Sequence, residues 1–129
     1  MAANAQVYTN TTIVDAAPST DTETIVASVG PVASNSYGSN VKILFNLGIT
    51  PGADTSAVVV KCYRNAIGGT QIGATQTIGV TAAQASNIFA AFIANEPVGN
   101  ATYVVAITCT SASANATVSR VAIVAIVGN

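Results

Sequence analysis

Hydrophobic and polar residues alternate along several stretches of this chain, which is the pattern of half-buried β-strands. Between residues 41 and 50 every odd position is a large hydrophobic residue, and the even positions are mostly polar or small. Residues 56–64 and 101–110 repeat this alternation. Residues 117–128 become apolar at nearly every position after Arg120, which predicts a strand that is central or covered on both faces.

Weaker signals surround these four stretches. Residues 24–29 form a β-rich run that Gly30 and Pro31 are expected to stop, and residues 75–81 suit another short strand. Residues 82–96 suit either a helical turn or a strand, and their β-rich surroundings favour a short strand after a helical turn. Residues 1–23 are polar and Thr-rich, which predicts an N-terminal arm or an irregular first strand.

About eight short strands, separated by turn signals, predict an all-β fold. Eight strands suit an antiparallel two-sheet β-sandwich that is jelly-roll-like. The alternative, an immunoglobulin-like sandwich, lacks its marker because the chain has no Trp. We therefore expect an arm over residues 1–23 and one β-sandwich domain over residues 24–129. The period of two predicts burial of Val41, Ile43, Phe45, Leu47, Val58, Val60, Tyr103, Val105, Ile107, Val124 and Ile126.

Composition favours a protein that assembles. Of the 129 residues 50% are hydrophobic and only 7% are charged, with a net charge of −1. Typical soluble proteins carry about 25% charged residues, so little repels a second copy here. An Ala-rich domain whose hydrophobic count is inflated by small residues is the alternative. The first twelve residues lack a signal peptide's basic and apolar regions, which predicts synthesis in a cytoplasm without Sec export.

Catalysis, cofactors and metals find little support in the residues. The chain has no His and no phosphate-binding Gly motif. Acids such as Asp54 and Glu96 lie in predicted turns, where we expect them to be solvated. Cys62 and Cys109 lie in apolar strands and are expected to be buried, reduced thiols, with a disulfide as the alternative. We predict that the protein is not an enzyme and binds no cofactor or metal.

Candidate interaction residues fall into two groups. Lys61, Tyr63 and Arg64 end one strand and Arg120 begins another, which suggests a polar patch for a subunit or a sugar, or an ordinary soluble strand face. The arm carries two apolar pairs that are too small to form a core, and we expect them to contact a neighbour: Val7, Tyr8, Ile13 and Val14. Four basic residues do not make a nucleic-acid surface, and the longest apolar run is too short for a membrane helix.

Two stretches, residues 42–73 and 103–126, resemble small virion proteins of tailed bacteriophages with a tumour-necrosis-factor-like jelly roll. Their shared features are a strand ending in a TPG-type loop, a strand running into a basic residue and a Gly-rich turn, and a Thr/Ala-rich final hairpin. The resemblance covers residues 24–127. It departs at Cys62 and at a near-neutral face that replaces a more basic strand, and it implies no functional residue.

This resemblance implies a structural virion protein, most of all a capsid decoration protein that trimerises and binds a major capsid or other virion protein. Two alternatives remain open. One is a receptor- or carbohydrate-binding module of a fibre or tail. The other is a major shell or filament subunit, in which the arm completes a neighbour's sheet by strand addition.

Overall fold

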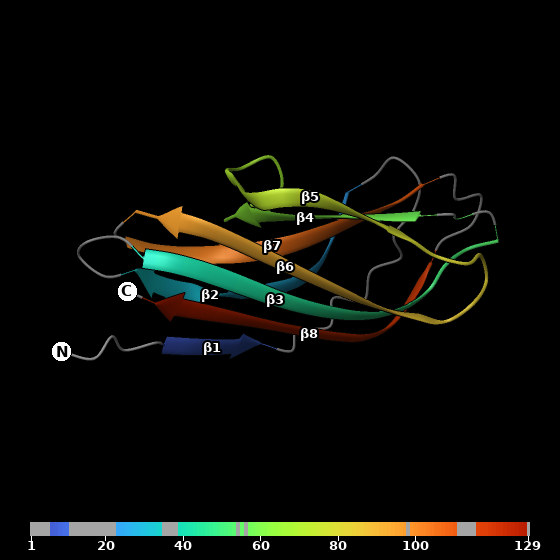
Figure 1. Ribbon diagram of the computed structural model, residues 1–129, viewed down its shortest axis with the longest axis horizontal. Helices are drawn as coiled ribbons and strands as arrows, with labels where there is room; N and C mark the ends of the chain where they lie inside the picture. The colour runs from blue at the N-terminus through green and yellow to red at the C-terminus, as the bar shows by residue number, and fades with distance from the viewer. Residues whose placement is uncertain are drawn as a thin grey trace.

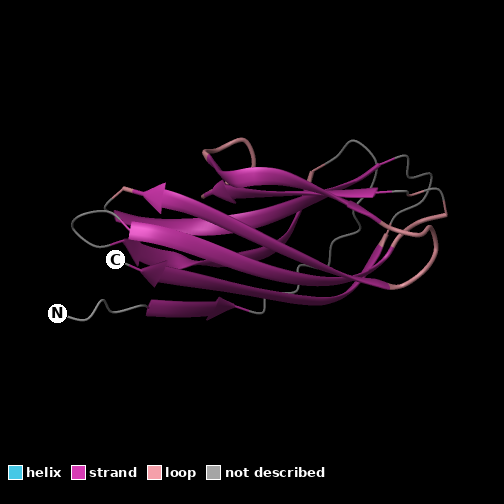
Figure 2. Ribbon diagram, viewed as in Figure 1, coloured by secondary structure: helices cyan, strands magenta, loops and turns pink. Residues whose placement is uncertain are grey.

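Eight strands make up most of the part of the chain that the structure describes (Figures 1 and 2). The computed structural model describes residues 6–10, 23–34, 39–53, 55, 57–97, 99–110 and 116–128, and none of these is helical. The strands are β1 (Gln6–Asn10), β2 (Thr24–Ser34), β3 (Ser39–Thr50), β4 (Ala57–Arg64), β5 (Gln71–Gly79), β6 (Ser86–Glu96), β7 (Gly99–Thr110) and β8 (Thr117–Gly128).

The strands form two four-stranded sheets, with the orders β1-β8-β3-β6 and β2-β7-β4-β5. All their pairings are antiparallel. The first strand pairs with the last, the second with the seventh, the third with the sixth and the fourth with the fifth. This nested pairing, wrapped into two sheets, is a jelly roll. It confirms the predicted all-β, two-sheet sandwich.

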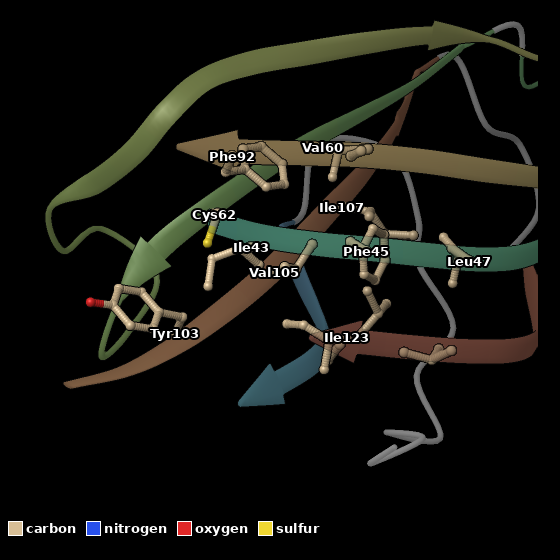
Figure 3. Packing of buried hydrophobic residues seen from close by; sticks show 14 of the residues in the cluster. Ile43, Phe45, Leu47, Val60, Cys62, Phe92, Tyr103, Val105, Ile107 and Ile123 are labelled. Carbon is tan, nitrogen blue, oxygen red and sulfur yellow. The ribbon is translucent and has the colours of Figure 1, made fainter. Parts of the chain in front are cut away.

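The core lies between the two sheets, where the large side chains of β3, β4, β6, β7 and β8 interlock (Figure 3). Nearly all predicted core residues are buried, but the prediction for Val124 and Ile126 is wrong because both are partly exposed. In β8 the opposite set is buried instead, led by Ile123, which lies opposite Phe45 of β3. Both faces of β8 are apolar, so its sequence pattern does not define which face turns inward.

Several strands extend further than predicted. β2 continues past Gly30 and Pro31, because a register shift between Val29 and Val32 leaves this dipeptide outside the ladder. A proline that is outside the ladder does not cost a strand hydrogen bond. Residues 86–96 form a strand of 11 residues, so the expectation of a short strand there is wrong.

Part of the predicted arm belongs to the domain's own sheet. Residues 6–10 form β1, which pairs with β8 from Gln6 opposite Val127 to Asn10 opposite Ile123. Figure 1 shows β1 as the outermost strand beside β8. Residues 1–5 and 11–22 lie outside the described residues, and the rest of the arm prediction falls there.

Candidate interaction surface

The outer face of the β1-β8-β3-β6 sheet contains a groove of about 440 Å³, here called the outer groove. Neighbouring positions of β3, β6 and β8 line it, together with Gln76 from β5. In register, each β3 residue stands between one residue of β6 and one of β8. The outward-facing lining residues are Leu44, Asn46, Phe89, Ala91, Ala122 and Val124.

Large apolar side chains are exposed on this face. Phe89 of β6 is 73% exposed and Ile93 is 58% exposed, whereas Phe92 of the same strand is 1% exposed in the core. Leu44 of β3 adds a third exposed side chain. Neighbouring exposed hydrophobic residues on a soluble domain are typical of an interaction site.

Strand β5 forms one side of the outer groove. The Gln76 side-chain amide donates a 2.6 Å hydrogen bond to the Ala91 carbonyl on the free edge of β6. Gly73 of β5 comes so close that a Cβ there would lie 3.2 Å from the Ile93 nitrogen. These contacts join the edges of the two sheets and fix Gln76 beside the groove.

One polar atom and two charges distinguish the outer groove from a purely apolar patch. Asn46 Oδ1 is buried and has no hydrogen-bond partner. Lys42 and Arg120 are exposed on the same outer face, because Lys42 precedes Leu44 by two positions and Arg120 lies opposite Gly48 of β3. Among the described residues, neither cation has an ion pair and no carboxylate lies on this face.

A separate cluster of polar side chains connects the two sheets at one end of the sandwich. Arg64 of β4 donates to both oxygens of Glu96 of β6, with Nε at 2.9 Å from Oε1. Tyr103 of β7 donates to the same Oε1 at 2.8 Å. Glu96 is 5% exposed, so the expectation of a solvated turn acid is wrong. This end cluster forms because β6 continues to Glu96, opposite Ser39 of β3.

The end cluster is electrostatically satisfied. Burial raises the pKa of Glu96, but the hydrogen bonds of Arg64 and Tyr103 and the guanidinium charge outweigh it and hold the pKa below 4.5. Burial, followed by the bond to Glu96, raises the pKa of Tyr103. The adjoining cavity of about 50 Å³ has room for a few water molecules but not for a substrate. The cluster is therefore suited to holding the two sheets together.

The polar side chains of β4 also contact the start of β2. Glu23 Oε1 accepts a 2.9 Å hydrogen bond from the Tyr63 hydroxyl and lies 3.4 Å from Lys61 Nζ. Tyr63 packs with Val104 and Ala106 on the outside of the β2-β7-β4-β5 sheet. Burial, the hydrogen bond to Glu23 and its charge raise the pKa of Tyr63 to about 12.

The predicted interaction residues do not form one patch. Lys61 and Tyr63 bind Glu23, whereas Arg64 binds Glu96 at the end of the sandwich. Arg120 belongs to the other sheet, nine β3 residues away from the Glu96 position, or about 30 Å along the strand. Val7 and Tyr8 lie on the edge strand β1, and Ile13 and Val14 fall outside the described residues.

Both cysteines are free and buried, as predicted. In the β4–β7 register Cys109 lies opposite Val58, which places Cys62 four residues further along, or about 13 Å away. A disulfide requires Cα atoms within about 7 Å, so the two thiols of one chain do not reach each other. Burial raises the pKa of Cys109, and burial with the nearby Glu96 charge raises the pKa of Cys62 to about 12.

The described part of the chain contains neither a metal-ligand cluster nor a membrane-length helix. Its residues include no group of three His, Cys, Asp or Glu side chains placed to hold a metal ion. They also include no helix that is long and apolar enough to cross a membrane.

Comparison with known proteins identifies the fold. No protein-family model and no curated protein sequence matches the chain. Among solved structures, it resembles the T13 viral particle of infectious bursal disease virus, with a TM-score of 0.65, 12% identity and coverage of 95% of this chain and 31% of that chain. The VP2 subviral particle of that virus matches with a TM-score of 0.62 and 13% identity, over 95% of this chain and 32% of that chain. The chain spans about a third of these proteins, and the likeness shows a shared jelly-roll sandwich.

Proposed function

We propose that this chain is a non-enzymatic structural protein of a virus particle. The observation that carries the proposal is the match of nearly the whole chain to one jelly roll of a viral-particle protein. The side chains support it as well. The polar clusters around Glu23 and Glu96 bind their own neighbours rather than framing a catalytic cleft, and apolar side chains are exposed on the outer face of the β1-β8-β3-β6 sheet.

The specific role that we propose is capsid decoration, in which a homotrimer binds across the subunits of a viral shell. Threefold association multiplies weak contacts to a symmetric lattice. The small number of charges favours self-association. Residues 1–23 would make contacts outside their own domain through Val7, Tyr8, Ile13 and Val14. The second edge of β1, the outermost strand of its sheet, offers backbone groups for such contacts.

The mass of the purified protein in solution tests this role. Native mass spectrometry and sedimentation velocity should give three times the 12.8 kDa chain mass. Electron microscopy of the same sample should show small discrete particles. Closed shells or filaments would favour a major shell or filament subunit instead, and a strict monomer at the highest soluble concentration would contradict the proposal.

A pair of variants tests the arm. Replacing Ile13 and Val14 by Ser removes an apolar pair outside the described strands and should shift the trimer to monomers without changing the circular dichroism spectrum of the folded domain. The control replaces Thr11 and Thr12 by Ser, which leaves the polarity of the arm unchanged. A trimer that survives the first pair of substitutions would mean that the arm is a passive leader.

A further inference from the structure

We infer that the outer groove is a docking site for an extended segment of a partner protein, with apolar side chains in its middle and carboxylates at its ends. Phe89 and Leu44 are exposed beside a groove with small residues between them, and the volume of about 440 Å³ falls within the range of ligand-binding pockets. The inference does not depend on a virion role.

The size of the groove favours a single segment over a whole protein face. The apolar face runs across three strands, roughly 10 Å, and from Phe89 to Ile93, about 13 Å along β6. A footprint of that size is far below the 800 Å² or so that each partner buries in a stable interface. One extended strand or loop matches the groove's width and length.

The charges indicate the chemistry of that segment. Lys42 and Arg120 stand beyond the two ends of the groove, separated by the six residue steps along β3 from Lys42 to Gly48, or about 20 Å. Two copies of this chain meeting through this face would bring like charges together, because none of the described residues supplies a carboxylate there. A segment of six or seven extended residues with acidic ends spans the two cations.

Asn46 supplies the polar contact. Its Oδ1 is buried without a partner between Phe89 and Ala122, and such an acceptor costs about 1–3 kcal/mol. The side-chain amide rotates about a torsion with broad minima, so the oxygen can turn towards an occupant. A backbone N–H of a docked segment then satisfies it, while apolar side chains contact Phe89 and Leu44.

A displayed library of random heptapeptides, selected on the immobilised full-length protein, tests the inference. We expect the enriched peptides to carry Phe, Leu or Ile centrally and Asp or Glu towards both ends. The tightest peptide, made synthetically, should lose at least tenfold in affinity with Phe89→Ala and with Lys42→Gln. The matched controls are Ile67→Ala, a half-exposed apolar residue in the β4–β5 turn, and Lys61→Gln on the other sheet, and neither should change the affinity.

Four results would overturn the inference. The first is an absence of enrichment, or enrichment of basic peptides, and the second is binding that persists in Phe89→Ala. The third is displacement of the peptide by micromolar dodecanoate, which would identify a site for small amphiphiles. The fourth is loss of the oligomer in Phe89→Ala, which would mean that a second copy covers the groove. A monomeric wild-type protein that still selects acidic, apolar peptides would contradict the proposed trimer and support the docking site.

Discussion

Replacing Glu96 by Gln removes the charge at the centre of the end cluster while preserving its shape. Arg64 and Tyr103 both donate to this carboxylate, and the amide of Gln offers only one oxygen to them. The other position becomes a donor that faces the guanidinium. The substitution therefore leaves a partly buried cation without its counter-charge, which is the costly way to break an ion pair.

The expected loss of stability follows from burial. Removing one partner of a buried ion pair costs about 3–5 kcal/mol. The Arg64 side chain is 26% exposed, so water still solvates part of the guanidinium, whereas the Glu96 side chain is 3% exposed. We expect Glu96→Gln to lower the free energy of unfolding by about 2–3 kcal/mol near neutral pH.

The loss should depend on pH in a defined direction. The pKa of Glu96 in the folded protein lies below its ordinary value of 4.5, so the carboxylate stabilises the fold fully above that value. This contribution disappears as the pH falls through the folded-state pKa. The difference in unfolding free energy between the wild type and Glu96→Gln should be constant from about pH 8 to pH 6 and shrink below about pH 4.5.

Urea unfolding followed by circular dichroism and tyrosine fluorescence measures this difference, since the chain has no Trp. Glu23→Gln is the matched control, because the Glu23 side chain is 27% exposed and its pair with Lys61 is partly solvated. We expect that control to cost about 1 kcal/mol or less. A loss below about 0.5 kcal/mol for Glu96→Gln at pH 7, or an equal loss at pH 7 and pH 3, would mean that the Glu96 charge does not stabilise the fold.

Three other predictions concern stability and titration. Phe92→Ala should lower the unfolding free energy by about 3–5 kcal/mol and Phe89→Ala by no more than about 0.5 kcal/mol, so similar urea midpoints would contradict the assigned register. Cys62 and Cys109 should not react with an aromatic disulfide reagent at about pH 8 until the chain unfolds, when two thiols per chain appear; a fast-reacting thiol in the native protein would disagree. The raised pKa of Tyr63 means that its stabilising contact is fully present below the ordinary pKa of 10.0 and is lost as the pH rises through about 12. Tyr63 should therefore stay protonated between pH 9 and 11, and Tyr63→Phe should leave the phenolate absorbance of the native protein unchanged in that range.

The sequence predicted the sandwich because hydrophobic residues recur at every second position of β3, β4 and β7, and a shift by one residue would turn that set away from the core. It did not predict which face of β8 turns inward, because apolar residues occupy both of its faces. The pairing of β8 with β3 around Phe45 determines the inner face. The extent of β6 was also underestimated, because its Ala-rich centre suits a helix as well as a strand. Long-range pairing with β3 settles that choice, and pairing of this kind cannot be read from local residues.

The candidate sites were harder to predict for the same reason. Glu96 becomes buried because Arg64, 32 residues away in the sequence, and Tyr103 of β7 meet it across the sandwich. The outer groove did have a local signal, since residues 88–93 are apolar at every position. A strand that is apolar on both faces buries one of them in the core. Its other apolar face stays exposed, which indicates an interaction surface. Whether Phe89 or Phe92 occupies the outer face depends on the register with β3.

The nested strand pairing has a consequence for how the chain folds. β1 and β8 are the most distant strands in the sequence, yet they become neighbours once the inner strands have paired. If the β4–β5 hairpin forms first, β3 can pair with β6 once the two short connections at residues 51–56 and 80–85 have closed. The pairs β2–β7 and β1–β8 can then form in turn, each after the pair inside it. Closing short loops in turn costs less entropy than closing one long loop. We therefore expect the hairpin turn at residues 65–70 to control the folding rate, and Gly69 to be its most sensitive position, because a Cβ there would lie 2.5 Å from the Arg64 carbonyl oxygen.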